Sequence, residues 1–273
     1  TESDPGPATA HLFSAAGGRL VLIDRNAEGL TNAIATLGEG HRSVIMDVTD
    51  EAAWTSVAEA IASDHGKLDI LVNNAGFGVF RSIAETTLEH WRAIMAVNLD
   101  SVFLATKHLL PLLAKSGNAA IVNMSSIRGI AAAANTGSYC AAKGAVRMFT
   151  KATALECAAL RNGVRANSIH PGHIETPLSA GVHADPATAA RLLADTPIGR
   201  VGKPEEIADA ILFLASETDL PMDERVEQAH AAAPADFARH GLRLPEDLAA
   251  VAGFGPAGGR AFAVLPEAPA LAA

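Results

Sequence analysis

The chain has 273 residues, 49% hydrophobic and 19% charged, so it is long enough to bury one substantial core and is expected to fold rather than stay disordered. Its formal net charge of −9 argues against a nucleic-acid partner, because a surface that binds phosphates must be basic. The two cysteines, Cys140 and Cys157, show neither a disulfide framework nor metal-ligand spacing, which favours a reduced, cytoplasmic setting.

Strand-like and helix-like segments alternate along the first 216 residues. A helix is expected from Pro5, with Asp4 as its N-cap. Strands are predicted at 19–24, 43–48, 69–74, 119–126 and 164–172, and helices at 26–38, 51–64, 87–115, 139–160 and 204–216. Because the strands are continuous Val/Ile/Leu runs rather than alternating ones, they predict an α/β fold with a doubly wound parallel sheet. Ligands then bind beyond the carboxyl ends of the strands.

The longest apolar stretch and the end of the chain raise separate questions. Residues 101–122 are interrupted by Lys107, His108, Pro111 and Lys115, so no membrane span is expected there. Residues 1–216 are interpreted as a single dinucleotide-binding and catalytic domain, and residues 217–273 as an Ala/Pro/Gly-rich tail. Helix is possible in this tail near 221–239 and 245–252.

Ser126, Tyr139 and Lys143 carry the strongest chemical signal. Tyr139 and Lys143 are four residues apart, so they share one face of a helix, and Ser126 ends the preceding strand. A free phenol has a pKa near 10, and a nearby ammonium favours the phenolate that a base requires. Ser126 can hold a substrate oxygen while Tyr139 exchanges a proton with it. A single Y-x-x-x-K is more often a surface tyrosine beside a solvated lysine, but Tyr139 is the only tyrosine in the chain.

Six stretches follow one another in the order and at the spacing of a known protein family: "LVNNAG" (71–76), "MAVNLDSVF" (95–103), "IVNMSS" (121–126), "YCAAK" (139–143), "RANSIHPGHIETP" (165–177) and "PIGRVGKPEEIADAILFLAS" (197–216). Together they make the chain resemble the short-chain dehydrogenases/reductases over residues 6–216. The resemblance implies a Rossmann-like fold, a nicotinamide dinucleotide and interconversion of alcohols and ketones. It implies Tyr139 as acid/base, Lys143 as its pKa modifier and a ribose contact, Ser126 as substrate orienter and Asn98 as holder of a water. Asn98 could otherwise be a helix-kinking or capping residue.

Asp24 is the clearest cofactor candidate, because a carboxylate at this strand end can accept hydrogen bonds from both ribose hydroxyls. It would repel a 2′-phosphate, so NAD is expected rather than NADP, although the adjacent Arg25 weakens the preference. Alternatively, Asp24 has no cofactor role and only caps the strand or forms a turn. Asp47 and Val48 lie where the family contacts adenine, and Asp47 could equally belong to a helix N-cap. The other expected cofactor contacts are Gly6, Asn74, Ala75, Gly76, Tyr139, Lys143, Pro171, Gly172, Ile174 and Thr176.

The opening residues depart from the family. Gly6 matches the last glycine of its T-G-x-x-x-G-x-G loop, whereas Asp4 stands where the middle glycine belongs, and the first strand has no counterpart. Pro5 and Pro7 lack N–H donors, and a carboxylate about 4 Å from a phosphate charge costs around 4 kcal/mol at an effective dielectric near 20. We therefore expect a central strand that is missing or replaced, and weak cofactor binding. The segment 260–266 could fill the slot, but no glycine loop follows it.

The sequence leaves the function open between three hypotheses. The first is an NAD(P)-dependent oxidoreductase acting on a secondary alcohol or its ketone, a small-molecule substrate. The second is an impaired or non-catalytic relative that binds or assembles, and the third is a 3-oxoacyl-thioester reductase. A homodimer or homotetramer is expected, because the family uses helices 87–115 and 139–160 for its contacts. No metal site, nucleic-acid partner or membrane partner is expected.

Overall fold

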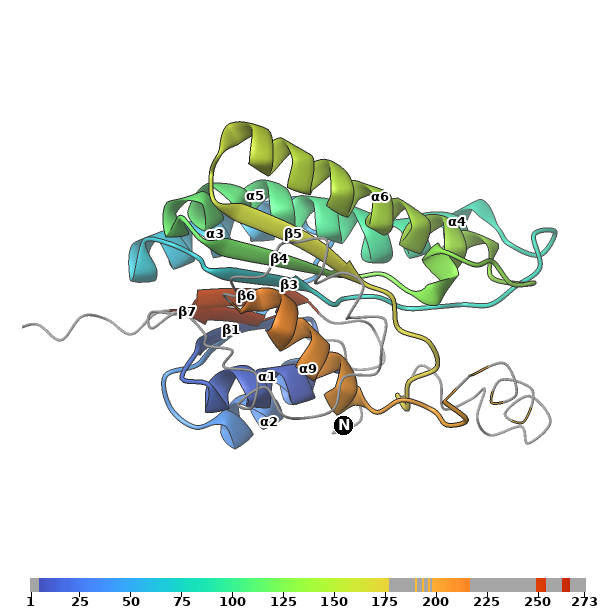
Figure 1. Cartoon of the computed structure of the whole chain (residues 1–273), viewed down its shortest axis with the longest axis horizontal. Helices are drawn as coiled ribbons and strands as arrows, with labels where there is room; N and C mark the ends of the chain where they lie inside the picture. The colour runs from blue at the N-terminus through green and yellow to red at the C-terminus, as the bar shows by residue number, and fades with distance from the viewer. Residues whose placement is uncertain are drawn as a thin grey trace, which may run out of the picture.

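The computed structural model describes residues 5–176, 190, 193, 196, 198–216, 249–253 and 262–265. These residues form helices and a single sheet (Figure 1). The helices are α1 (Pro5–Ala15), α2 (Ala27–Leu37), α3 (Glu51–His65), α4 (Leu88–Met95), a π-helical turn η1 (Ala96–Asp100), α5 (Ser101–Ser116), a 3₁₀ turn η2 (Ile127–Gly129), α6 (Gly137–Leu160) and α9 (Pro204–Ala215). The strands are β1 (Arg19–Asp24), β2 (Arg42–Ile45), β3 (Ile70–Asn73), β4 (Ala119–Met124), β5 (Val164–Ile169), β6 (Ala249–Gly253) and β7 (Phe262–Leu265).

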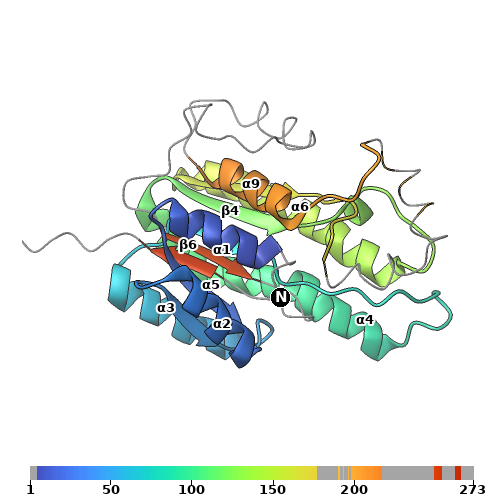
Figure 2. The ribbon, with the colours of Figure 1, turned by 90° about the horizontal axis from the view of Figure 1, so that it is seen from below.

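The seven strands follow the order β2-β1-β6-β7-β3-β4-β5. The pairs β1–β2, β3–β4 and β4–β5 are parallel, as is β1–β6, whereas β7 runs antiparallel to its neighbours. Helices cover both faces: α3 to α6 lie on one side, and α1, α2 and α9 lie on the other (Figures 1 and 2). The prediction of a doubly wound, Rossmann-like α/β sheet is therefore confirmed.

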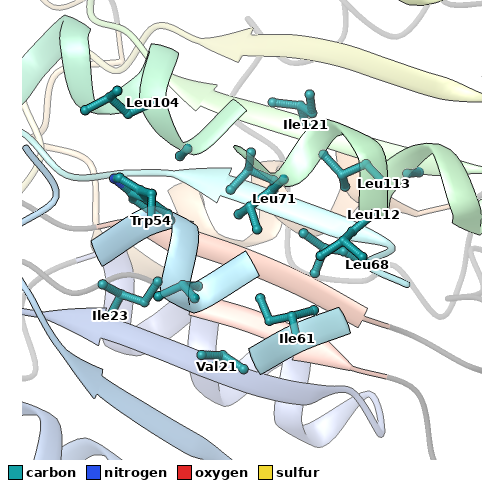
Figure 3. Packing of buried hydrophobic residues seen from close by; sticks show 14 of the residues in the cluster. Val21, Ile23, Trp54, Ile61, Leu68, Leu71, Leu104, Leu112, Leu113 and Ile121 are labelled. Atoms are coloured by element: carbon teal, nitrogen blue, oxygen red, sulfur yellow. The ribbon is translucent and has the colours of Figure 1, made fainter. Parts of the chain in front are cut away.

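A hydrophobic core lies on each face of the sheet. On one face, Trp54 and Ile61 of α3 pack with Leu71 of β3 and with apolar residues of α5 (Figure 3). The Trp54 indole is 2% exposed, and its Nε1 donates to the Val48 carbonyl at 2.8 Å, so its one polar group is satisfied inside the core. On the other face, α1, α2 and α9 pack over the opposite sides of the same strands. Burial on both faces explains why the strands read as continuous apolar runs.

Three predicted strands end at least two residues earlier than expected, and each has a local cause. The strand predicted at 43–48 ends at Ile45, because the Asp47 carboxylate accepts from the Thr49 backbone N–H at 2.9 Å and turns the chain. The strand predicted at 164–172 ends at Ile169, ahead of Pro171, which has no N–H for a ladder. The strand predicted at 119–126 ends at Met124 because Ser126 caps η2, its hydroxyl accepting from the Arg128 N–H at 3.1 Å.

The region 245–252 contradicts a helical expectation over its described part. Ala249–Gly253 is strand β6, which pairs with β1 from Arg19↔Ala249 to Ile23↔Gly253. Alanine favours helix locally, but tertiary pairing in the middle of a sheet overrides such propensities. Strand β7, within the segment 260–266, also lies in the central part of the sheet. Residues from the end of the chain thus lie between β1 and β3 in the sheet. Residues 221–239 lie outside those described.

The continuous helical stretch Leu88–Ser116 is long and apolar enough, by length and composition, to cross a membrane. In this fold it packs against other elements: α5 contacts α3, β3 and β4, and Leu109 and Leu113 are fully buried. Its apolar character is accounted for by the core of the sheet, as expected for an internal helix of an α/β domain.

Candidate active site

The four predicted catalytic residues come from three places in the chain. Ser126 follows β4, Asn98 lies in the π-turn η1, and Tyr139 and Lys143 lie one turn apart near the start of α6. Helix α6 contacts both η1 and η2, which draws these segments together beyond the carboxyl ends of the strands. The structure brings all four residues to one site.

Lys143 is buried, with 3% of its surface exposed. Its Nζ donates to the Met124 carbonyl at 2.8 Å and lies 5.8 Å from the centre of the Tyr139 ring. Burial disfavours the ammonium and lowers the pKa of Lys143 to about 8. Lys143 is therefore not a solvated surface lysine, which was the alternative interpretation of the Y-x-x-x-K spacing.

Tyr139 sits at the mouth of the site, partly exposed and edge-on to Phe80, with ring centroids 6.1 Å apart. Burial of the phenol raises the pKa of Tyr139, while a hydrogen bond with the Ser126 side chain opposes that rise. The net direction is upward, opposite to the one expected from Lys143 alone, because desolvation of the hydroxyl outweighs the favourable contact. Tyr139 is therefore protonated at neutral pH.

Asn98 is completely buried, and its amide clamps the loop that follows β3. Its Oδ1 accepts from the Phe77 N–H at 3.2 Å, and its Nδ2 donates to the Phe77 carbonyl at 2.9 Å and the Ile94 carbonyl at 3.0 Å. A Cβ on Gly76 would lie 2.7 Å from Asn98 Oδ1 and 3.1 Å from Lys143 Nζ. Only glycine fits there, so the loop after β3 passes close to Asn98 and Lys143 at Gly76.

Several supporting residues were not identified from the sequence. The Ser125 hydroxyl donates to the Lys143 carbonyl at 2.9 Å, and a Cβ on Gly129 would lie 2.7 Å from that same carbonyl. His170 Nδ1 lies 3.2 Å from the Ser126 carbonyl. These contacts fix η2 against α6 and so set the spacing between Ser126 and Tyr139. The paired serines ahead of a glycine in "SSIRG" were the available signal for Ser125 and Gly129.

The adenosine-side candidates lie at the carboxyl ends of β1 and β2. Asp24 ends β1 and is 4% exposed, with Oδ1 accepting from the Asn26 N–H at 2.8 Å, whereas Arg25 next to it is exposed. Asp47 is exposed just beyond β2, and Val48 is buried. The N-cap of α3 is Asp50 rather than Asp47, which removes the capping alternative for Asp47.

The nicotinamide-side candidates follow β3 and β5. Asn74, Ala75 and Gly76 lie in the loop after β3, with Gly76 beside Lys143. Beyond β5, the Pro171 carbonyl accepts from the Ile127 N–H at 3.0 Å, which joins this loop to η2, and Ile174 bridges to Gly202. Gly172 is exposed, and Thr176 is the last residue described before 190. Among the described residues, no three His, Cys, Asp or Glu side chains gather as a metal site.

Gly6 lies apart from these groups in the chain, in the first turn of α1, where it is buried. Pro5 is the first helical residue, as predicted, and Asp4 lies outside the described residues. Because β1 follows α1 after a short turn and α1 packs on β1, the start of α1 is at the same end of the sheet as Asp24. Gly6 thus faces the edge that carries the other candidates.

Comparison with known proteins agrees with this geometry. Residues 5–220 match the family model described as enoyl-(acyl carrier protein) reductase, a model of the short-chain dehydrogenases/reductases. The chain belongs to the short-chain dehydrogenase/reductase family. The cyclopentanol dehydrogenase of Comamonas sp. is 38% identical over 210 residues, which cover 76% of this chain and 83% of that one. The NADP-dependent (R)-specific alcohol dehydrogenase of Lentilactobacillus kefiri is 38% identical over 216 residues, 78% of this chain and 85% of that one.

A solved structure has the same fold. The crystal structure of gox2181 superposes with a TM-score of 0.74 at 28% identity, covering 78% of this chain and 84% of that one. Family membership and the dehydrogenase relatives make the protein an oxidoreductase. Members of the family use NAD or NADP.

A glycine motif near the end of the chain was not identified from the sequence. Strand β6 ends at Gly253, and the sequence from there reads Gly253-Phe-Gly-Pro-Ala-Gly258, which has the G-x-G-x-x-G spacing of a dinucleotide-binding turn. This signal lies at the far end of the chain from the first helix, ahead of which the family carries its glycine loop.

Proposed function

We propose that the protein is an NAD(P)-dependent oxidoreductase that interconverts a secondary alcohol and a ketone, with Ser126, Tyr139, Lys143 and Asn98 as its catalytic group. The observation that carries the proposal is the buried Lys143, which lies one helical turn from Tyr139 with its Nζ 5.8 Å from the centre of the Tyr139 ring. Holding an ammonium out of water is costly, and such perturbed groups cluster at functional sites.

The residues at the carboxyl edge suit a dinucleotide. Gly76 leaves no room for a side chain beside Asn98 and Lys143, which permits the backbone to approach a ligand closely. Asp24 offers a carboxylate at the end of β1 for ribose hydroxyls, and Asn74, Ala75 and Gly76 offer backbone groups at the end of β3. When bound, the nicotinamide supplies or accepts the hydride.

The side chains of the site then handle the proton. Ser126 holds the substrate oxygen, and Tyr139, which keeps its proton at neutral pH, donates it to the oxygen of a ketone during reduction. Oxidation requires the phenolate, which the Lys143 ammonium favours by its positive charge. Since the pKa of Lys143 is about 8, this support is present below that pH and is lost as the pH rises through it. Asn98 holds the loop after β3 in place beside Lys143.

NAD is the proposed cofactor. A carboxylate at the end of β1 binds ribose hydroxyls and repels the 2′-phosphate of NADP. The exposed Arg25 and the NADP-dependent relative from Lentilactobacillus kefiri argue for the opposite preference, so the choice depends on Asp24. The named relatives suggest a cyclic or small aliphatic secondary alcohol as substrate. The two free cysteines support a reduced, cytoplasmic location.

Substitution of Tyr139 by Phe tests the proposal. The variant should retain the fold and NADH binding but lose at least 99% of its activity with a panel of cyclic and aliphatic secondary alcohols. Phe80→Leu is the matched control, because it alters the ring packed on Tyr139 and leaves the proton-bearing hydroxyl in place. Retention of more than a few per cent of activity in Tyr139→Phe would refute the assigned proton transfer.

Two alternatives keep specific support. The proline-rich start of α1 favours a protein with weak cofactor binding and a binding or assembly role, which failure to bind NADH would reveal. The matched family model, described as enoyl-(acyl carrier protein) reductase, favours a reductase of acyl thioesters such as 3-oxoacyl thioesters. Turnover of a 3-oxoacyl thioester in preference to cyclic ketones would select that function.

A further inference from the structure

His170 is a half-buried histidine to which the proposed reaction gives no role, and it contacts the backbone of Ser126. It follows Ile169, the last residue of β5, while Ser126 lies just beyond the neighbouring strand β4. Its Nδ1 lies 3.2 Å from the Ser126 carbonyl oxygen, and its Nε2 lies 2.9 Å from Ser168 Oγ. The imidazole therefore connects a side chain of β5 with the residue that is proposed to hold the substrate oxygen.

These two contacts indicate where the imidazole carries its proton. A carbonyl oxygen can only accept a hydrogen bond, so Nδ1 bears a proton and donates it to Ser126. In the neutral ring Nε2 is then the acceptor, and the Ser168 hydroxyl donates to it. Because the partner of one ring nitrogen sets the proton on the other, Ser168 favours the tautomer that the contact with Ser126 requires.

The imidazole reaches Ser126 between two backbone contacts of the same segments. The residues on either side of Ser126 donate their N–H groups to the carbonyls of Ile169 and Pro171, at 2.8 and 3.0 Å. Pro171 has no N–H to return, so the His170 ring supplies a donor here. The Ser126 carbonyl also accepts from the Gly129 N–H at 2.8 Å, which closes η2. Two donors thus hold this one carbonyl, from the loop after β5 and from η2.

The orientation of this carbonyl determines where the Ser126 hydroxyl lies. Ser126 is extended, with φ −167° and ψ 160°, and its Oγ accepts from the Arg128 N–H at 3.1 Å. A change of ψ at Ser126 would rotate the carbonyl away from His170 and carry the Arg128 N–H away from Oγ. The hydroxyl would then leave its place in the site that Ser126 shares with Tyr139. A displacement of 1 Å can cost about a hundredfold in rate, so the contact has a functional consequence.

We propose that His170 is a positioning residue that, as the Nδ1–H tautomer, holds the Ser126 carbonyl and thereby the hydroxyl that meets the substrate oxygen. This inference rests on the proposed function and adds a residue to the same site. His170 acts through Ser126 and takes no part in the proton transfer itself. Its loss should therefore lower the turnover of bound substrate and leave NADH binding and the fold unchanged.

Nitrogen NMR of the full-length chain labelled with nitrogen-15 histidine tests the contact without any measurement of activity. The His170 signals are assigned by their absence from the spectrum of His170→Asn. At neutral pH they should show a protonated Nδ1. A ring without a proton on Nδ1 would overturn the contact with the Ser126 carbonyl.

Two variants of nearly the same shape test the positioning role. His170→Asn can place an amide N–H where Nδ1 lies, whereas His170→Leu has the same branching without a donor. With the most active secondary alcohol, kcat should fall at least tenfold in His170→Leu and stay within threefold of the wild type in His170→Asn. The dissociation constant for NADH and the melting temperature should be the same in both. His11→Leu, an exposed histidine of α1, is the control and should change none of these values.

Equal kcat values in His170→Leu and His170→Asn would overturn the positioning role, because the two variants differ in the donor. Tenfold weaker NADH binding in His170→Leu would also overturn it, since His170 would then act on the cofactor. Ser168→Ala gives a second measurement that holds even where the leucine variant does not fold. It removes the partner of Nε2, so kcat should fall with NADH binding unchanged, and an unchanged kcat would contradict the role given to the tautomer.

The same measurements separate this inference from the proposed function. If Tyr139→Phe loses its activity while His170→Leu keeps it, the proposed function stands and the role of His170 fails. If the wild type oxidises no secondary alcohol although Nδ1 is protonated, the proposed function fails together with the positioning role, and only the hydrogen bond to Ser126 stands.

Discussion

Replacing Lys143 by Met should make the protein more stable at neutral pH while abolishing its activity. Lys143 is 3% exposed, and its Nζ donates a hydrogen bond to the Met124 carbonyl. No carboxylate is paired with it among the salt bridges of those residues. A buried ammonium of this kind lowers the free energy of unfolding, although the proposed reaction requires it.

The magnitude follows from the pKa of Lys143, which burial lowers from 10.5 to about 8. At 1.36 kcal/mol per pKa unit, keeping the folded lysine charged at pH 7 costs about 3 kcal/mol. The loss of the Met124 hydrogen bond offsets about 1 kcal/mol of the gain, so Lys143→Met should raise the free energy of unfolding by about 2 kcal/mol. Methionine has a similar length and is flexible enough to fill the same volume.

The sign of the pH dependence provides a second check. As the pH rises through about 8, the folded lysine releases its proton while the unfolded one keeps it until about 10.5, so stability of the wild type rises with pH. The variant lacks this rise, so the difference in free energy of unfolding between the variant and the wild type should shrink by about 2 kcal/mol between pH 7 and pH 9.5.

Urea denaturation of both proteins at pH 7 and pH 9.5 measures these effects. Lys151→Met, an exposed lysine on the same helix, is the control and should change stability little. Destabilisation of Lys143→Met by more than 1 kcal/mol at pH 7, or an advantage that does not depend on pH, would refute the reasoning.

Three further predictions concern the cofactor site and the assembly. Gly76→Ala should lower activity at least tenfold and reduce the melting temperature, because its Cβ would lie 2.7 Å from Asn98 Oδ1. Gly137→Ala is the control and should be neutral, because its Cβ would meet only Ile83 Cγ1 at an ordinary 3.7 Å, and equal behaviour of the two variants would contradict the close approach at Gly76. Asp24→Ser should shift the ratio of dissociation constants toward NADP at least tenfold, and an unchanged ratio would show that Arg25 dominates. Sedimentation at micromolar concentration should show a dimer or larger assembly formed through α5 and α6; a monomer would contradict it. These helices expose Phe103, Met148, Leu155 and Leu160.

The sequence predicted most of the fold because its signals are local. Continuous apolar runs predicted β1 and β3 to β5, and the four-residue spacing of Tyr139 and Lys143 placed both on one face of α6. The glycine requirement at Gly76 was expected as a tight turn, but the structure adds its cause, the contact with Asn98 and Lys143 across the chain.

The remaining features depend on long-range contacts. The raised pKa of Tyr139 depends on desolvation, which no spacing reveals, and the clamp of Ser125 and Gly129 on the Lys143 carbonyl depends on how η2 meets α6. The alanine-rich segment of β6 has helical propensity, and its pairing with β1, far away in the sequence, makes it a strand.

Titration of the purified full-length protein with NADH, followed by nicotinamide fluorescence, tests the central claim most directly. The account predicts saturable binding of one NADH per chain, tighter than that of NADPH, with an enhanced and blue-shifted emission as the nicotinamide enters a less polar site. Absence of saturable binding up to millimolar NADH and NADPH would contradict the proposal that this fold and its Ser126, Tyr139 and Lys143 site serve a nicotinamide-dependent reaction.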